Sequence, residues 1–564
     1  MPRHSVAPSS VFVVCCLTAL GACGDGGSGP AGTDASVPRD ANGVPTYHQD
    51  VAPIVARHCL TCHVEGGIGP FVLDTFASVR FAAPEAREAI ETRQMPPWMP
   101  DPSCGDLVGE RRLSDEEIAT FVAWVEGGTP EGDPATATPI EPVTPPTFVP
   151  THTAAAPGYV PNPDVPDDYR CFVLDFEFEE DSYLTASTVV PDASALVHHV
   201  LVYSLGPEDV AAAEALDAAE EGPGYTCFGG PLPMGDDAGS SSLPTQLGAW
   251  VPGALPAIYP EGAGIPIRAG SRVVMQIHYN LLSTDPERDA TEFAMRLTTT
   301  PVTRAIDTHP LPKLDLMIPA GSPSSTQTQF FLNSRSTPMT IESLTGHMHL
   351  LGKSIRAQIV RADGTEECGL NIPRWDFDWQ QAYTLAAPLV LQPGDGIRLT
   401  CEYDNSEDNQ PVINGVQLEP RTVTWGEGTL DEMCLMYISE SRPLEDTVDV
   451  DCATATSACF AACDRSDFEC LWGCEAMDDR CGRCQLEATL NCLRGTCLGQ
   501  LAAAQTCLRE CAVSSIVLEG SFERCLATTC PSQWEGLVAC AAPVFDAGTC
   551  DEGLIACDIT REAE

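Results

Sequence analysis

Residues 195–203 have the sequence ALVHHVLVY, in which apolar and β-branched residues surround two adjacent histidines. Similar short runs recur from about residue 167 to residue 445, separated by Gly, Pro, Asp or Asn; they include Arg272–Tyr279, Ser354–Val360 and Gly396–Tyr403. Many short strands with turn residues between them are typical of antiparallel β-sandwiches. Because this region is longer than one sandwich usually needs, we predict two jelly-roll-like sandwiches, over residues 167–300 and 301–445.

The segments on either side of this β-rich region differ from it in composition. Residues 45–132 predict a small all-α domain, since Ser114 and Glu117 form a capping box that precedes apolar residues at helical spacing. Residues 133–166 are rich in Pro and Thr and predict a linker. Residues 446–564 contain 16 of the 27 cysteines, some of them four apart. This tail predicts short helices joined by disulfides, with metal binding as the alternative.

The N-terminus predicts an exported protein. Arg3 and His4 precede the apolar run Val11–Leu20, which is too short to span a bilayer and ends just before Cys23. This pattern resembles a bacterial lipoprotein signal peptide over residues 1–23, followed by a flexible linker over 24–44. The alternative is ordinary cleavage nearby, with Cys23 in a disulfide. We expect a periplasmic or cell-surface lipoprotein of a bacterium, held to the membrane by a lipid on Cys23.

Charge and cysteine content restrict the partners. The chain has 80 Asp and Glu against 30 Lys and Arg, a net charge of −50, which would repel the phosphates of nucleic acids. So many cysteines require an oxidising compartment, in agreement with export. We expect no nucleic-acid partner.

Residues 59–63, CLTCH, have the spacing of covalent c-type haem attachment. Cys59 and Cys62 lie one helical turn apart, so that each thiol can add to a vinyl group while His63 faces the iron. A Met thioether is a common second axial ligand; we predict Met95, with Met99 as second choice. The alternative is that both cysteines belong to the disulfide framework. Residues 45–128 resemble a class I-like cytochrome c domain, which implies one haem c.

The histidines of the β-rich region indicate metal binding. His347 and His349 are two residues apart, so on a strand they project from the same face and can share one metal ion. His198 and His199 would diverge on a regular strand; to share a metal they require a local twist or the use of different ring nitrogens. Met433 is a sulfur candidate downstream. Imidazole together with thioether suits copper that cycles between two oxidation states.

Four motifs occur in a fixed order: VHHVLVY at 197–203, QIHY at 276–279, HMHLLGK at 347–353 and EMC at 432–434. Together they resemble the ascorbate-dependent type II copper monooxygenases, the family of peptidylglycine α-hydroxylating monooxygenase and dopamine β-monooxygenase. The resemblance covers about residues 167–440. It implies one electron-transfer copper held by His198, His199 and His278, and one oxygen-binding copper held by His347, His349 and Met433.

The resemblance also implies that the two coppers lie well separated across a solvent-filled cleft. Each would deliver one electron to O2, and a substrate C–H bond would be hydroxylated. Cys401 and Cys434 match a family disulfide. Cys171 and Cys227 lie near other family disulfide positions, with their partners open.

One departure from the family concerns the substrate. Peptidylglycine enzymes bind a substrate carboxylate through an arginine and an asparagine at positions that are Thr345 and Leu435 here, although Tyr437 matches the tyrosine of that clamp. Neither Thr345 nor Leu435 can form a charge-assisted bond to a carboxylate. We therefore do not expect a glycine-terminated peptide as the substrate.

The combined prediction is a copper monooxygenase that uses O2 on a small molecule and receives electrons from a periplasmic donor through its own haem. The alternative is a non-catalytic lipoprotein that carries electrons or binds metal. Complete ligand sets at two different copper positions favour the enzyme.

Overall fold

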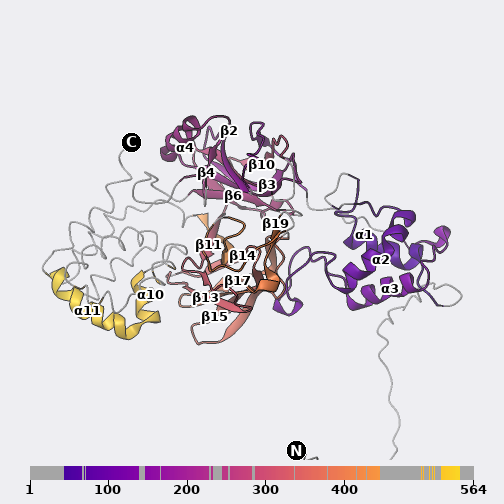
Figure 1. Cartoon of the computed structure of the whole chain (residues 1–564). Helices are drawn as coiled ribbons and strands as arrows, with labels where there is room; N and C mark the ends of the chain where they lie inside the picture. The colour runs from indigo at the N-terminus through magenta and orange to yellow at the C-terminus, as the bar shows by residue number, and fades with distance from the viewer. Residues whose placement is uncertain are drawn as a thin grey trace, which may run out of the picture.

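The computed structural model describes two long stretches of the chain and part of its C-terminal segment (Figure 1). The stretches are 43–138 and 147–444, apart from residues 66–68, 70, 166, 228–229, 233–243, 252–253, 282–285, 336, 378, 414–415 and 427. The C-terminal part comprises residues 497, 500, 507, 511, 514 and 522–546. The predicted signal peptide, Cys23 and most of the first linker lie outside the described residues. Among the helices that are described, none has the length and apolar character needed to cross a membrane.

The N-terminal unit is helical, as predicted. Its elements are η1 (Tyr47–Val51), α1 (Ala52–His58), α2 (Phe76–Glu91), η2 (Pro102–Cys104), α3 (Asp115–Glu126) and η3 (Pro134–Thr136). The capping box at α3 is confirmed, because Ser114 accepts from the Glu117 amide and the Glu117 carboxylate accepts from the Ser114 amide. Trp124, which is fully buried, packs with Phe121 and Val51 in the centre of the unit.

The first β-sandwich has two antiparallel layers. One layer has the strand order β5-β2-β9-β4-β6, and the other has β1-β10-β3-β8 with β7 beside β3. The bounds are β1 (His152–Ala155), β2 (Asp167–Glu177), β3 (Ser182–Val190), β4 (Val197–Leu205), α4 (Pro207–Ala219), β5 (Tyr225–Thr226), β6 (Thr245–Trp250), β7 (Ala257–Ile258), β8 (Ala263–Ile267), β9 (Arg272–Asn280) and β10 (Glu292–Thr298). Apolar side chains from alternating strand positions fill the space between the layers, as the period of two requires.

The second β-sandwich packs β11-β22-β14-β17 against β13-β18-β15-β16. Its elements are β11 (Arg304–Pro312), β12 (Met317–Ile318), β13 (Ser325–Leu332), β14 (Met339–His347), β15 (Gly352–Val360), β16 (Glu366–Ile372), β17 (Tyr383–Leu391), β18 (Gly396–Tyr403), η4 (Glu407–Asn409), β19 (Val412–Ile413), β20 (Val416–Gln417), β21 (Val423–Thr424) and β22 (Leu435–Pro443). The predicted β-sandwich architecture is therefore confirmed.

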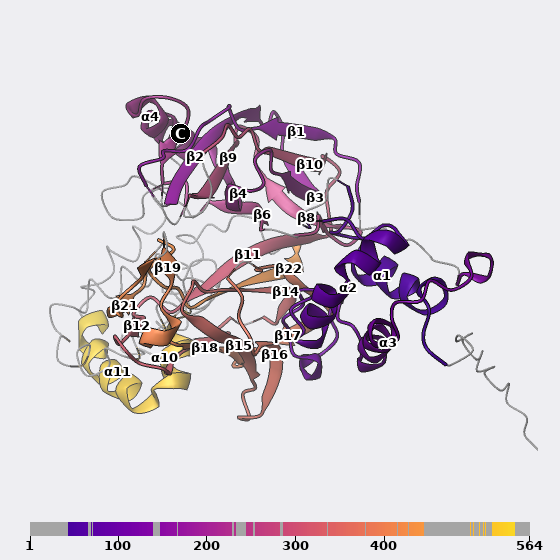
Figure 2. The ribbon, with the colours of Figure 1, turned by 45° about the vertical axis from the view of Figure 1, so that its right-hand side comes forward.

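The two sandwiches share one sheet. β8 pairs in parallel with β11, through Ala263 with Arg304 and Gly264 with Ala305, so that a nine-stranded sheet continues from one sandwich into the other (Figure 2). The backbone amides of Thr303 and Arg304 both donate to the Gly262 carbonyl at this junction. This edge-to-edge pairing restricts how the sandwiches lie relative to each other.

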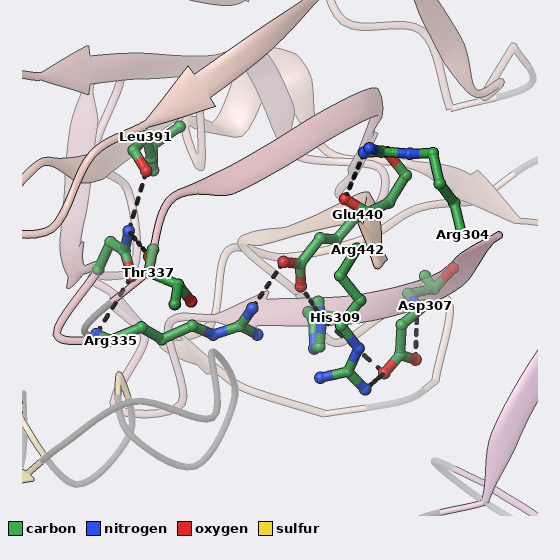
Figure 3. A network of polar contacts seen from close by, with 11 residues as sticks. Arg304, Asp307, His309, Arg335, Thr337, Leu391, Glu440 and Arg442 are labelled. Atoms are coloured by element: carbon green, nitrogen blue, oxygen red, sulfur yellow. Dashed lines mark hydrogen bonds and ion pairs between the residues drawn. The ribbon is translucent and has the colours of Figure 1, made fainter. Parts of the chain in front are cut away.

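A buried charged network supports the shared sheet in the second sandwich (Figure 3). The Glu440 carboxylate accepts from His309 Nε2 at 3.0 Å and from Arg335 Nη1 at 2.6 Å. Burial raises the pKa of Glu440, but the His309 hydrogen bond and the Arg335 charge outweigh burial and lower it to about 2. Burial lowers the pKa of His309, but the carboxylates of Asp307 and Glu440 outweigh burial and raise it above its ordinary value.

Disulfides join elements within and between these units. Cys401–Cys434 is present, as the resemblance implies, and Cys171 pairs with Cys227. Cys104–Cys368 joins the helical unit to the second sandwich, a bond that the sequence analysis did not predict. In the C-terminal segment, α10 (Phe522–Thr529) and α11 (Pro531–Asp546) supply one cysteine each to the bonds Cys511–Cys525 and Cys497–Cys540. Cys530, between the two helices, pairs with Cys507.

Candidate metal centres

The first candidate metal centre lies between two neighbouring strands of the first sandwich. β4 carries His198 and His199, and β9 carries His278 directly beside His199. The pairing register shifts between Val197 and His199, which marks a β-bulge. A bulge rotates one extra side chain out of the regular alternation. This local irregularity is what allows two adjacent histidines to face the same point.

The three imidazoles converge through the same ring nitrogen. His199 Nδ1 lies 3.3 Å from His198 Nδ1 and 3.4 Å from His278 Nδ1. Two nitrogens that each bind one ion at about 2.0 Å can be at most about 4 Å apart. His278 Nε2 donates to Asp167 Oδ1 at 2.8 Å, which fixes the ring with Nδ1 toward the other two histidines. The ambiguity over ring nitrogens is thereby resolved, because all three histidines present Nδ1.

Burial keeps these rings in the neutral form that binds metals. Burial, and secondarily the neighbouring histidines, lowers the pKa of His198 to about 3 and that of His199 well below its ordinary value. The pKa of His278 is also lowered by burial, although the Asp167 hydrogen bond opposes the change. The cluster is therefore chemically ready for a cation at neutral pH.

The second candidate centre lies where β14 ends. His347 is the last residue of β14 and His349 follows it, with their ring centroids 5.1 Å apart. His347 Nδ1 donates to Gln380 Oε1 at 2.5 Å, and His349 Nδ1 donates to the Asp431 carbonyl at 3.0 Å. Both Nδ1 atoms are thus engaged, so each ring has Nε2 for a metal ion. Burial lowers the pKa of His347 to about 4 and that of His349 to about 3.

Met433 is held beside this loop by its backbone. Its carbonyl accepts from Tyr403 Oη at 2.7 Å, and the next residue, Cys434, is bonded to Cys401. Met433 is 4% exposed. Copper binding by Met433 and by the five histidines stays a prediction.

Glu432 holds the loop of the second centre, a structural role that the sequence analysis did not predict. Its carboxylate accepts the backbone amides of His349 at 2.9 Å, Leu351 at 2.6 Å and Met433 at 3.3 Å. It thus joins the segment before β22 to the loop of the second centre. Burial raises its pKa to about 8, although the three amides oppose that change. Its position beside Met433 was the available signal, but an acidic residue in a motif does not reveal which amides it will bind.

The two centres are neighbours, which corrects the expectation of a wide, solvent-filled cleft. The rings of His199 and His347 lie 6.2 Å apart between centroids. Phe377 stacks on His198 at 4.4 Å and lies 6.2 Å from the His349 ring. The two sandwiches contact each other beside the centres, which brings the two sites together. In this contact Asp167 Oδ1 accepts from both His278 and Thr429 Oγ1, the latter at 2.6 Å.

The positions of the family's substrate clamp lie on the strands of the second centre. Leu435 pairs with His347, and Tyr437, two residues further along β22, pairs with Thr345. Leu435 is buried, whereas Thr345 and Tyr437 are half-buried. The side chains at these positions are therefore neutral.

The C-x-x-C-H motif lies at the end of α1 in the helical unit. Among the described cysteines, Cys59 and Cys62 are the two with free thiols. Neither cysteine therefore takes part in one of the described disulfides, which was the alternative to haem attachment. His63 Nδ1 donates to the Phe71 carbonyl at 2.9 Å, so Nε2 is the nitrogen available to an iron. Met95 is 40% exposed. Met99, the second choice of ligand, is instead buried in the core of the second sandwich beside Trp98.

Comparisons with known proteins agree with the copper resemblance. Residues 315–468 match the family described as "Copper type II ascorbate-dependent monooxygenase, C-terminal domain", a stretch that includes His347, His349 and Met433. The chain is 25% identical over 297 residues to mouse "DBH-like monooxygenase protein 2", covering 48% of this chain and 43% of that protein. It is 24% identical over 302 residues to "Tyramine beta-hydroxylase" of Caenorhabditis briggsae, covering 49% and 46%. The chain thus spans less than half the length of these relatives.

Among solved structures, the major capsid protein P2 of bacteriophage PM2 matches with a TM-score of 0.18 and 7% identity, covering 49% of this chain and 97% of that one. That likeness is too low to carry an argument. The family match and the two relatives support an oxidoreductase of the copper monooxygenase type, and copper is the metal expected for that family.

Proposed function

We propose that the protein is a copper monooxygenase that hydroxylates a C–H bond of a small molecule with O2. Two electrons and two protons enter per turnover, so that one oxygen atom ends in the hydroxylated product and the other in water. The observation that carries this proposal is the convergence of three imidazole Nδ1 atoms next to the His347–His349 pair, with the His199 and His347 rings 6.2 Å apart between centroids. When bound at the two centres, copper would supply the two one-electron steps that reduce O2.

The chain's own residues hold the two centres in place. Asp167, Gln380 and the Asp431 carbonyl each accept a hydrogen from one imidazole, which fixes ring orientation and tautomer. Burial keeps the rings neutral, so no proton competes with the metal. Glu432 positions the His349 amide and the Met433 amide together, which supports a shared site for His347, His349 and Met433.

The same proposal includes one covalent haem c in the helical unit, attached to Cys59 and Cys62, with His63 and Met95 as axial ligands. The residues fit this group. The two thiols are free, and the His63 ring is oriented by the Phe71 carbonyl. The Phe71 ring lies 4.8 Å from the His63 ring and is 46% exposed, so an apolar side chain that a porphyrin would cover lies open beside the motif. Met95 is 40% exposed. When attached, the haem would supply electrons one at a time.

The substrate side of the second centre favours a molecule without a carboxylate at the clamp position. Thr345 and Leu435 stand there, and neither offers a charge to a carboxylate. A buried leucine opposite His347 favours apolar contact with the part of the substrate next to the reacting bond. The identity of the small molecule is a matter for screening.

We further propose that the enzyme works outside the cytoplasm as a lipoprotein anchored through Cys23 and reduced by a periplasmic donor. Support comes from the bacterial lipobox-like sequence before Cys23 and from the disulfides of the described residues, which require an oxidising compartment.

The test is metal analysis combined with product analysis on the exported full chain. Copper and haem are quantified in the native protein, in His347→Ala, in Met433→Ala and in His152→Ala, a matched control on an exposed histidine. The native protein and the control should hold two coppers and one covalent haem. The other two variants should keep one tightly bound copper.

With labelled O2 and ascorbate as reductant, the native protein should transfer one labelled oxygen atom into a screened substrate. Haem without copper, or copper indifferent to His347 and Met433, would reject the enzyme and leave an electron-transfer or metal-binding lipoprotein.

A further inference from the structure

One loop of the second sandwich contacts both the helical unit and the two metal centres. We call residues 373–377 and 379–382, between β16 and β17, the connecting loop. Its sequence is rich in aromatic and amide side chains. It was not singled out from the sequence, because none of its residues is a typical metal ligand.

On one side, the connecting loop holds the segment that contains Met95. Arg374 Nη1 donates to the Thr92 carbonyl at 2.8 Å, just beyond α2, where a cation is favourable. Trp379 Nε1 donates to the Pro97 carbonyl at 2.8 Å. The loop therefore binds the chain on both sides of Met95.

The segment after Met95 is inserted into the second sandwich. Trp98 and Met99 are buried in its core, and the Trp98 ring meets Tyr383 edge-on at 5.4 Å. Hydrogen bonds between backbones continue this contact, from Asp101 to Asn371, Val108 to Thr384, and Ala386 to Asp106. The disulfide Cys104–Cys368 then closes it covalently. The helical unit is thus fixed on the second sandwich at this place.

On its other side, the connecting loop contacts the metal centres. Gln380 Oε1 accepts from His347 Nδ1, and Trp375 Nε1 donates to the His349 carbonyl at 3.2 Å. Phe377 stacks on His198. The hydrogen bonds of the loop thus reach the second centre, and a ring contact reaches the first.

A side chain of the helical unit completes a continuous connection. Arg111 donates to Gln381 Oε1, and its guanidinium lies over the Trp98 ring at 5.7 Å. The Arg111 carbonyl accepts from His58 Nδ1 at 2.9 Å, and His58 directly precedes Cys59. Since Gln381 follows Gln380 in the chain, Arg111, Gln381, Gln380 and His347 form a chain of hydrogen bonds and covalent bonds that starts beside the haem-attachment motif.

We propose that the connecting loop delivers electrons from the haem directly to the His347–His349 centre, through Arg111, Gln381 and Gln380. This inference rests on the proposed function. In each transfer the ferrous haem iron becomes ferric, and Cu(II) at that centre becomes Cu(I); one electron moves, with no bond formed and no proton transferred. Tunnelling decays more slowly through covalent and hydrogen bonds than through gaps, so the chain of contacts favours entry at the second centre.

The test follows one electron without O2 or substrate. The full chain with reduced haem is mixed anaerobically with Cu(II). Alternatively, the chain is prepared with Cu(II) and its haem is reduced by a light pulse. Haem oxidation is followed by absorbance, and copper reduction is followed by EPR. His278→Ala damages the first centre and should keep a rapid haem oxidation. His347→Ala damages the second centre and should lose the rapid phase. The opposite pattern would overturn the proposal, because electrons would then enter at the first centre.

A second pair of variants tests the route itself. Gln381→Leu removes the contact with Arg111 and leaves Gln380 on His347, so it should slow haem oxidation several-fold at unchanged copper and haem content. Gln358→Leu, a half-buried glutamine on β15 that bonds to Glu366, is the matched control and should oxidise at the native rate. Equal rates in the two variants would exclude Gln381 from the route. The haem and copper contents of the native protein are measured before any kinetics. A native protein that lacks haem or copper would reject the proposed function itself.

Discussion

The two candidate metal centres lie side by side but are built differently. The first centre is built on two paired strands: His198 and His199 come from β4 and His278 from the neighbouring strand β9. The second begins where a strand ends, and its rings are oriented by partners in loops, namely Gln380 and the Asp431 carbonyl. The first presents Nδ1 from each ring, whereas the second has Nδ1 engaged and Nε2 available.

This difference determines what each centre depends on. Strand pairing and one bulge set the first, so its geometry persists as long as the sheet persists. The second depends on a buried carboxylate, on a disulfide and on two loops that are distant in sequence but adjacent in space. We therefore expect substitutions outside the histidines to release the second copper more readily than the first.

The largest effect is expected for Glu432→Ala. It leaves the amides of His349, Leu351 and Met433 without their acceptor in a buried place, at about 1–3 kcal/mol for each unsatisfied group. The free energy of unfolding should fall by at least about 3 kcal/mol, and copper content should fall from two to one. Denaturant unfolding and metal analysis measure both. Glu432→Gln keeps one carbonyl oxygen, so its stability and copper content should lie between those of the native chain and Glu432→Ala. If Glu432→Ala retains two coppers, the two centres do not differ in the way proposed.

Acid should weaken the second sandwich through Glu440. Its pKa is about 2 in the folded chain against about 4.3 in an unfolded one, so its contribution is complete above about pH 4.3 and is lost as pH falls toward 2. That contribution is on the order of 3 kcal/mol. His309 has a raised pKa, so its contribution is present below about pH 6.5 and is lost as pH rises through the folded value.

The measurement is the unfolding free energy of the metal-free chain between pH 3 and pH 9. Glu440→Gln should flatten the acid side of the profile. Glu179→Gln, an exposed glutamate in the first sandwich, should leave the profile as it is. An unchanged acid slope in Glu440→Gln would show that the buried network does not carry the pH dependence.

The sequence was sufficient for features whose signal is local. Short β-rich runs separated by turn residues predicted the sandwiches, and Ser114 with Glu117 predicted the start of α3. The spacing of His347 and His349 predicted that their rings lie close together, and their centroids are 5.1 Å apart, although the strand ends at His347. The Cys401–Cys434 bond followed from family resemblance, since 33 residues separate its ends.

Other features depend on contacts that no local pattern encodes. The bulge at His198 arises from pairing with β9, and Cys104 meets Cys368 across 264 residues. Asp167 and Gln380 have no sequence motif, because their role is to touch a histidine that folding brings to them. The closeness of the two centres likewise depends on contacts between the sandwiches, such as those of Asp167 with Thr429 and of His198 with Phe377, and so the resemblance alone gave the wrong separation.

A smaller effect is expected at Asp167. Asp167→Ala removes the acceptor that orients His278, and loss of such a partner typically lowers metal affinity by about 10–100-fold. The loss should fall on the first copper, as measured by competition with a chelator. Asp168→Ala is the matched control, since Asp168 bonds to Tyr159 and the Asn162 amide. If Asp167→Ala and Asp168→Ala weaken copper equally, the effect is a general loosening of β2.

The smallest effect is expected at Phe377, which stands between the centres. Its ring lies nearly parallel to His198, with 20° between the planes, and a stacked aromatic pair contributes about 0.5–1.5 kcal/mol beyond burial. Phe377→Leu keeps an apolar side chain but loses that stacking, so affinity at the first centre should fall by at most about tenfold. Phe377→Tyr keeps the stacked ring and should bind copper as the native chain does. Phe377 also lies near His349. If Phe377→Leu lowers the copper affinity of both centres equally, the two differently built centres respond as one site.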